Sequence, residues 1–182
     1  FPATDPRAGL FTRVGFALSG ARDDNLIIRG ARIRKDYFCQ NLTPPAAFVL
    51  SSAVPINGPP TMRNIVIANT QVPGTSCTGC HANSINPIGF ALENYDSFGR
   101  YRTKENIYDP KDGTIASVVP VDATSVPKLD ASTTQVSDGI ELSKQIGDSM
   151  DFNACFVRHY FRFSQGRTEN ISGDGCKLNR ML

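Results

Sequence analysis

Cys77-Thr78-Gly79-Cys80-His81 is the stretch around which the rest of this sequence is organised. Two cysteines at this spacing, followed directly by a histidine, are typical of a site where haem c is attached. Thiols one helical turn apart can reach the two vinyl groups on one edge of a porphyrin, while the next imidazole reaches the iron. The sequence therefore predicts one covalent haem c per chain, bonded to Cys77 and Cys80 and ligated by His81.

Two other kinds of site share part of this motif. A zinc site needs a second pair of ligands at short spacing, and the remaining candidates form no such pair: Cys39, Cys155, His159 and Cys176. A thioredoxin-like dithiol lies between a strand and a helix of a βαβ unit, and no such pattern surrounds residue 77. A dithiol or disulfide is therefore the main alternative to haem attachment, ahead of zinc.

Length and composition favour a globular protein of one or two compact units. The chain has 182 residues, of which 40% are hydrophobic and 20% charged. No apolar run is long enough to span a bilayer, and the scattered net charge of +2 gives no reason to expect nucleic acid binding. Since thioether haem is attached outside the cytoplasm and Phe1 starts the chain without a leader, we expect a processed or truncated piece of an exported, periplasmic or extracellular protein.

Composition changes near residue 58, and we place a domain boundary there. Residues 1–58 are predicted to hold two short helices and a proline-rich strap that begins near residue 42. Residues 59–182 are predicted to form the haem c-binding domain. The second N-terminal helix is basic, and its charged face is either simply solvated or meets an acidic redox partner or the haem propionates. The basic residues are Arg29, Arg32, Arg34 and Lys35.

Hydrophobic periodicity predicts several helices besides the one that carries the motif. They are expected at 61–68, 90–95, 137–146 and 152–165. A proline-bearing turn at 85–89 is expected to end the motif helix, and Gly166 to end the last one, which has an aromatic face that includes Phe156 and Phe163. The stretch 104–135 is expected to be a long polar loop with a strand only near 115–121, and the tail after Gly166 is expected to be irregular.

The order of these elements resembles that of a class I cytochrome c. In that family the first and last helices cross beside the haem, and a methionine in the loop before the last helix is the sixth iron ligand. Met150 stands at that place here. The resemblance implies a mainly α fold, namely a cytochrome c-like helical haem domain with long irregular loops and an N-terminal helical or extended extension.

A closer resemblance covers nearly the whole chain. The sequence looks like the C-terminal modules of large secreted planctomycete and myxobacterial proteins, which are catalogued as uncharacterised cytochrome-like domains. This resemblance implies a covalent haem c and an extracytoplasmic location, without a settled activity. The chain lacks the long region usual upstream, so we expect a fragment or one subunit of an assembly. The matching stretches are 7–10, 28–30, 39–45, 77–81, 86–96, 99–102 and 163–167, of which 86–102 is the most specific.

Three side chains are candidates for the sixth iron ligand: Met150, His159 and Met62. We rank Met150 first. A methionine opposite His81 would raise the reduction potential, whereas a second histidine would lower it. His159 is equally compatible with a half-exposed surface position, and Met62 with an ordinary core position.

Four further residues are expected to contact the cofactor. Arg100 and Arg102 are placed to pair with the haem propionates, because guanidinium groups bind carboxylates in a bidentate way. Phe90 is expected to wall one face of the haem, and Pro87 lies in the turn directly after the motif.

The cysteines outside the motif are odd in number, which leaves their pairing open. In an oxidising compartment one pair should close. We expect Cys155 to pair with Cys176 and Cys39 to be a buried free thiol, while pairing of Cys39 with either of the others stays open.

These features favour a monohaem c-type cytochrome that carries electrons outside the cytoplasm rather than a catalyst. Its expected partners are a redox protein and, as a subunit or fragment of a larger assembly, other subunits or the upstream part of its own precursor. One alternative is an enzyme with five-coordinate haem, of peroxidase or oxygenase type. The other is a haem-bearing structural subunit of a complex or filament.

Overall fold

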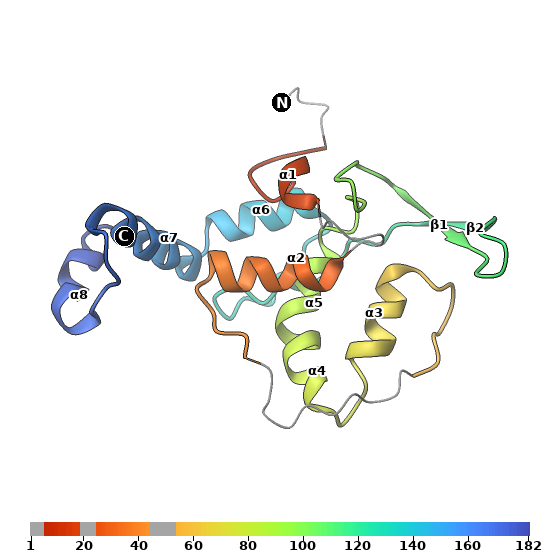
Figure 1. Cartoon of the computed structure of the whole chain (residues 1–182), viewed down its shortest axis with the longest axis horizontal. Helices are drawn as coiled ribbons and strands as arrows, with labels where there is room; N and C mark the ends of the chain where they lie inside the picture. Colours follow the sequence, from red (N-terminus) through yellow and green to blue (C-terminus); the bar gives the residue numbers. More distant parts are fainter. Residues whose placement is uncertain (1–5, 19–24, 44–53) are drawn as a thin grey trace.

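The computed structural model of the chain describes residues 6–18, 25–43 and 54–182 (Figure 1). Much of the predicted proline-rich strap, residues 44–53, lies outside the described residues. The helical elements are α1 (Val14–Ala17), α2 (Leu26–Arg32), the π-helical turn η1 (Ile33–Tyr37), α3 (Met62–Thr70), α4 (Ser76–Cys80), the π-helical turn η2 (His81–Ile85), α5 (Asn86–Phe90), α6 (Gly139–Gly147), α7 (Met150–Gln165) and α8 (Ile171–Asn179). The strands are β1 (Lys104–Tyr108) and β2 (Ile115–Pro120).

The predicted mainly α, cytochrome c-like fold is wrong, because the chain also forms a two-stranded antiparallel sheet and is a mixed α and β domain. The sheet projects from the body as a hairpin of β1 and β2 (Figure 1). The sequence predicted β2 from its β-branched residues, but β1 is too polar to predict. Only two of its side chains are buried, Glu105 and Ile107. Pairing with β2 therefore makes β1 a strand in spite of its composition.

Helices α2 and α5 cross at the centre of the molecule with their backbones in direct contact (Figure 1). A Cβ atom built on Gly30 would lie 2.1 Å from the carbonyl oxygen of Ile85. A Cβ atom built on Gly89 would likewise lie 2.1 Å from the carbonyl oxygen of Leu26. Both distances are far below van der Waals contact, so only glycine permits this crossing at either position.

The main hydrophobic core surrounds this crossing and draws on both sides of residue 58. Its buried members are Phe11, Phe16, Ala17, Ile33, Phe38, Ile88, Ala91, Leu92, Tyr95, Leu129, Val136, Leu142 and Ile146. Burial of these apolar side chains is the dominant favourable term in folding. The domain boundary at residue 58 stays a prediction, and the described N-terminal elements share this core with α5 and α6.

Two of the four basic residues of the second N-terminal helix are structural. Arg29 is 2% exposed, and its guanidinium donates to the carbonyl oxygens of Ala17, Leu92, Tyr95 and Asp96. Arg34 is 4% exposed and donates to the carbonyl oxygens of Ser84, Pro127 and Lys128. Neither side chain is solvated or available to a partner, because the guanidinium groups satisfy carbonyls at the ends of neighbouring segments. Arg32 and Lys35 are exposed.

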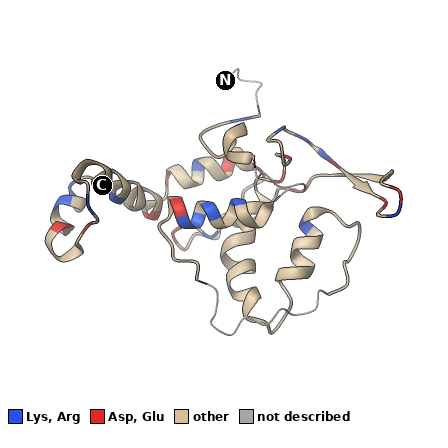
Figure 2. Ribbon diagram, viewed as in Figure 1, with Lys and Arg blue, Asp and Glu red and all other residues tan. Residues whose placement is uncertain are grey.

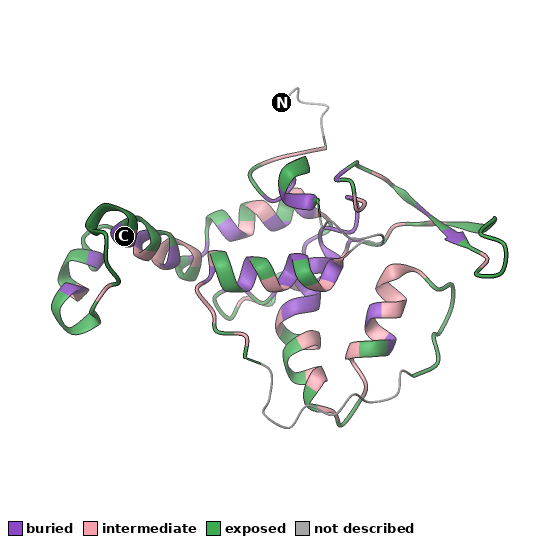
Figure 3. Ribbon diagram, viewed as in Figure 1, coloured by how far each residue is buried: buried purple, intermediate pink, exposed green. Residues whose placement is uncertain are grey.

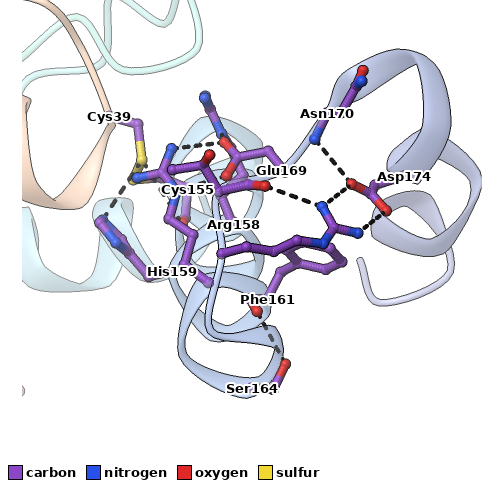
Figure 4. Close-up of polar contacts among 12 residues, drawn as sticks. Cys39, Cys155, Arg158, His159, Phe161, Ser164, Glu169, Asn170 and Asp174 are labelled. Atoms are coloured by element: carbon purple, nitrogen blue, oxygen red, sulfur yellow. Dashed lines mark hydrogen bonds and ion pairs between the residues drawn. A yellow bond between two sulfur atoms is a disulfide. The ribbon is translucent and has the colours of Figure 1, made fainter.

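Helices α7 and α8 form an arm that extends from the body (Figure 1). Helix α7 agrees with its sequence signals, since Ser149 caps its start and Gly166, at φ 64°, ends it. Helix α8 lies in the tail that we expected to be irregular. It is held by a small apolar cluster of Val157, Phe161 and Leu178 and by ion pairs of α8 and of the turn before it. Figure 4 shows the polar contacts of this arm, with Glu169 and Asp174 labelled. The ion pairs join Arg158 and Arg162 to Glu169, and Arg167 to Asp174.

The aromatic face expected on α7 is largely exposed. Phe156, Tyr160 and Phe163 are 62%, 55% and 87% exposed, whereas Cys155, Val157 and Phe161 are buried. Helical spacing alone located the apolar residues but not the side of the helix that packs. Within the described ranges, none of the helices combines the length and the hydrophobicity that a bilayer span requires.

A disulfide joins Cys39 to Cys155 and so ties η1 to α7 (Figure 4). The presence of a disulfide is confirmed, but the preferred pairing of Cys155 with Cys176 is wrong. Cys155 lies on the side of α7 that packs against η1, and its sulfur atom is bonded there to that of Cys39. Cys176 is exposed on α8 and has no disulfide.

Replacement of Cys39 by serine is expected to lower the free energy of unfolding by about 2–4 kcal/mol. The bond closes a loop between residues 116 positions apart, so its loss frees the unfolded chain and detaches α7 from η1. Urea unfolding under oxidising conditions measures the change, with Cys176→Ser as the matched control that should leave stability unaltered. A reductant that has no effect on wild-type stability would contradict this assignment.

Candidate functional site

The predicted haem-attachment motif, Cys77 to His81, lies in α4 and the first residue of η2. Thr75 and Thr78 both donate a hydroxyl hydrogen bond to the carbonyl oxygen of Val72, at 2.8 Å and 2.6 Å. These bonds fix the preceding turn against the first turn of α4. Cys77 and Cys80 are three residues apart on this short helix, a spacing that places them on the same face of it.

The two motif cysteines are free thiols in the structure, Cys77 half-buried and Cys80 exposed. They therefore remain separate although Cys39 and Cys155 are bonded. A Cβ atom on Gly79 would meet nothing within 4 Å, so the chain leaves this part of α4 open. Burial increases from α4 towards α5, so the motif lies at the accessible end of a helix whose other end is in the core (Figure 3).

The imidazole of His81 is held by the side chain of Asn86. Its Nδ1 atom lies 3.1 Å from Oδ1 of Asn86. In a regular α-helix two residues five positions apart point about 140° away from each other. The π-helical turn η2 removes this difference, because the backbone N–H of Asn86 donates to the carbonyl oxygen of His81 and brings the two residues together.

Asn86 also links the motif to α3. Its side chain is fully buried, and Nδ2 donates to Oγ1 of Thr70 at 2.9 Å. The hydroxyl of Thr70 in turn donates to the carbonyl oxygen of Val66 at 2.6 Å. Sequence reasoning missed Asn86 and Thr70 as site residues, because α-helical spacing separates Asn86 from His81 and nothing in the sequence pairs it with Thr70.

The segment that carries the motif has no charged side chains of its own, although Lys128 and Arg34 contact η2 through Asn83 and Ser84. Residues 64–92 contain no Lys, Arg, Asp or Glu, so α3 after its first turn, α4, η2 and α5 carry no charged side chain (Figure 2). A low density of charge limits solvation of the surface and suits a large apolar ligand.

The donor set fits a covalently attached haem c. It comprises two free thiols at the C-x-x-C sequence spacing and an imidazole whose Nδ1 atom is already hydrogen-bonded, so that Nε2 is the atom left to ligate iron. Zinc would need further ligands beside the motif. Within the described residues, the one group whose ligand atoms lie close enough together to hold a metal ion is elsewhere, at Cys39, Cys155 and His159. Two of those three atoms are sulfurs of the disulfide.

Pro87 and Phe90, expected to contact the cofactor, are both buried in α5. The carbonyl oxygen of Pro87 accepts a hydrogen bond of 2.6 Å from the hydroxyl of Ser125. Phe90 packs in a cluster with Leu26 and Val66, and the guanidinium of Arg63 lies 4.4 Å from the centre of its ring. Both residues hold α5 in place, and their contact with a cofactor stays a prediction.

Arg100 and Arg102, expected to meet the propionates, have protein partners. Arg100 is largely exposed and donates to the carboxylate of Asp96 at 2.7 Å. Arg102 is half-buried, and its Nε atom donates to the carbonyl oxygen of Glu93 at 3.3 Å. A propionate would have to compete with these contacts, so the pairing with haem stays a prediction.

The structure does not bring the three candidate sixth ligands to His81. Met150, 67% exposed, and His159 lie on α7, which Figure 1 shows at a distance from α4. Nε2 of His159 lies 3.0 Å from the carbonyl oxygen of Asp36. Met62 starts α3 and packs near Phe90, at the opposite end of that helix from Thr70. Ligation by any of them stays a prediction.

Glu93, three residues after the end of α5, carries a buried carboxylate. The side chain of Glu93 is 2% exposed, and its Oε2 atom lies 3.6 Å from Nη1 of Arg63. Burial raises the pKa of Glu93 to about 7; Arg63 opposes this rise and Glu105 adds to it. The desolvation cost of a charge in the protein interior therefore exceeds the attraction of its partner.

Replacement of Glu93 by glutamine is expected to change the pH dependence of stability. Because the folded pKa of Glu93 is raised, its protonation favours the folded state below pH 5 and this contribution is lost as the pH rises through 7. Relative to the variant, wild type should lose about 2 kcal/mol of unfolding free energy between pH 5 and pH 8. Urea unfolding at the two pH values measures this, and equal changes in both proteins would contradict it.

Comparison with known proteins gives one result. The family model of PSCyt3, a protein of unknown function (DUF1588), matches residues 7–105. This range contains α2, α3, the motif and α5, which are the elements that build the site. No curated protein and no solved structure matches the chain significantly. Because the family match covers more than half of the 182 residues, this chain belongs to the PSCyt3 family of proteins of unknown function.

Proposed function

We propose that this protein is a monohaem c-type cytochrome that transfers electrons outside the cytoplasm, as a subunit or fragment of a larger assembly. The observation that carries the proposal is the arrangement at α4. Cys77 and Cys80 present two free thiols on one short helix, and His81 follows with Nδ1 engaged by Asn86. A dithiol or a structural disulfide at residues 77 and 80 would give the histidine no such role.

Attachment requires no oxidant. Each thiol adds across one vinyl group, so that the sulfur bonds to the carbon next to the ring and the thiol hydrogen passes to the terminal carbon. Cys77 and Cys80 would make these two bonds, and His81 would ligate the iron through Nε2. The haem supplies a one-electron couple when bound. The stretch 64–92 itself would place no charged side chain beside the haem, and Lys128 and Arg34, which contact Asn83 and Ser84 of η2, would be charged groups near it.

Membership of the PSCyt3 family is compatible with the proposed role and leaves the activity open. The finer proposal is that the chain is a module of the secreted planctomycete and myxobacterial type, with a partner that accepts or supplies the electron. Electrostatic steering of that partner by this surface would be weak, since residues 64–92 carry no charge.

A five-coordinate haem enzyme is the second candidate, and one observation favours it. Met150 and His159 lie on α7, away from α4, so neither is in place as a sixth ligand. An iron with an open position can bind peroxide or oxygen, whereas two axial ligands restrict it to electron transfer.

The visible spectrum of the exported, haem-loaded chain distinguishes the two candidates. Electron transfer predicts a low-spin spectrum in both oxidation states and no rapid binding of carbon monoxide. If Met150 is the ligand, the ferric protein should show a sulfur charge-transfer band that disappears in Met150→Ala. A high-spin ferric spectrum with rapid binding of carbon monoxide would reject the electron carrier in favour of the enzyme.

A further inference from the structure

We propose that Asn86, itself oriented by Thr70, is a positioning residue that fixes the tautomer of His81 with the proton on Nδ1 and the lone pair on Nε2. The consequence for iron rests on the proposed haem attachment, whereas the tautomer itself does not. The chain of contacts runs from the carbonyl oxygen of Val66 through Thr70 and Asn86 to His81.

The direction of every hydrogen bond follows from its first member. The carbonyl oxygen of Val66 can only accept, so the single hydroxyl hydrogen of Thr70 is used on it, at 2.6 Å. The oxygen of Thr70 is then left as an acceptor. The atom of Asn86 that lies 2.9 Å from it must therefore be the amide nitrogen, which donates.

With the amide nitrogen assigned to Thr70, the oxygen of Asn86 is the atom that faces His81. This oxygen can only accept, so Nδ1 of His81, 3.1 Å away, must carry a hydrogen. A neutral imidazole has one N–H group, and Nε2 consequently keeps its lone pair. The side chain of Asn86 is fully buried, which limits the competition of water for its two contacts.

His159 gives an internal contrast. Its Nε2 atom lies 3.0 Å from the backbone carbonyl oxygen of Asp36, which can only accept. Neutral His159 is therefore expected to be the Nε2–H tautomer, opposite to that of His81. The two histidines of this chain should thus show opposite tautomers in the same NMR spectrum.

The first experiment measures the tautomers in the full chain produced without haem. Side-chain nitrogen and carbon chemical shifts of the two histidines at alkaline pH, assigned with His159→Gln, should show Nδ1–H for His81 and Nε2–H for His159. In Thr70→Val the acceptor for the Asn86 amide is lost, and His81 should become a mixture of tautomers. Thr70→Ser should restore the wild-type pattern. An Nε2–H tautomer of His81 in the folded wild type would overturn the proposal.

The second experiment uses the haem-loaded chain and measures the reduction potential. Asn86→Asp places a carboxylate against Nδ1–H, which makes His81 a stronger electron donor and favours ferric iron. The equilibrium should shift at least about tenfold towards the ferric state, which is about 59 mV for a one-electron couple. Thr70→Ser is the control, with a potential close to that of wild type.

The two proposals fail in different ways. A wild-type chain that carries no haem would remove the proposed function and leave the tautomer measurement as a full test of the inference. A haem-loaded Asn86→Asp protein with an unchanged potential would overturn the inference and leave the proposed function standing. If the haem-free chain does not fold, as shown by collapsed amide shifts, the potential alone decides.

Discussion

Replacement of Gly89 by alanine is expected to lower the free energy of unfolding by about 3 kcal/mol or more, enough to threaten folding. The added methyl group would lie 2.1 Å from the carbonyl oxygen of Leu26 and 2.8 Å from its carbonyl carbon. Both atoms belong to the backbone of α2, so no side chain can rotate out of the way. Helices α2 and α5 would have to separate, and the core around Ile88 and Leu92 would open with them.

Urea unfolding followed by circular dichroism measures this effect, with Gly147→Ala as the matched control. A Cβ atom on Gly147, the last residue of α6, meets nothing within 4 Å. That variant should be as stable as wild type or more stable by up to about 1 kcal/mol, because alanine restricts the unfolded chain. A Gly89→Ala protein as stable as the control would show that α2 and α5 do not cross at this point.

Replacement of Arg29 by methionine is expected to cost about 3–5 kcal/mol of unfolding free energy. Methionine has a similar volume and keeps the apolar contacts, but it cannot donate hydrogen bonds. The carbonyl oxygens that Arg29 satisfies lie at the end of α1 and after α5, namely those of Ala17, Leu92, Tyr95 and Asp96. Buried carbonyl groups without a donor destabilise the folded state, and several are left at once.

Lysine at position 29 should recover only part of this loss, because one ammonium group cannot reach carbonyls that surround a planar guanidinium. Arg32 lies on the same helix and is exposed, so Arg32→Met is the control and should change stability by less than about 0.5 kcal/mol. Thermal and urea unfolding of the three variants would measure the difference. Equal stabilities of Arg29→Met and Arg32→Met would contradict a structural role for Arg29.

The sequence predicted the elements whose signals are local. The 61–68 prediction matches α3, and the 137–146 and 152–165 predictions match α6 and α7, because apolar periodicity and capping residues mark each helix. The start of α3 is capped by Thr61, whose hydroxyl oxygen accepts from the backbone N–H of Asn64. These interactions join residues a few positions apart, so they can be predicted from a short stretch of sequence.

Elements that depend on distant partners were missed. Strand β1 owes its conformation to β2, and α8 to apolar contacts with α7 and to the ion pair that Asp174 makes with Arg167 in the preceding turn. The break expected at 85–89 did not occur either. The proline at position 87 lies in the first turn of α5, directly after the π-helical turn η2, and the helical path runs on from α4 through η2 into α5.

The candidate site divides in the same way. Cys77, Cys80 and His81 are contiguous and their pattern predicts the chemistry, although haem attachment itself stays a proposal. Thr70 and Asn86 act only through a π-helical turn and a contact between two helices. Arg29 and Arg34 show why charge patterning alone was not enough. The pattern predicted that the basic residues are solvated or contact a partner, whereas both side chains are buried and donate hydrogen bonds to carbonyl oxygens.

The central proposal is tested most directly by the mass of the chain after export in a host that attaches haem c. We expect wild type to exceed the mass of its polypeptide by one haem and to be red. The variants Cys77→Ser and Cys80→Ser should each lose one thioether bond, the double variant should lose the covalent haem, and Cys176→Ser should keep it. A colourless wild-type protein with free thiols at residues 77 and 80 would contradict the account.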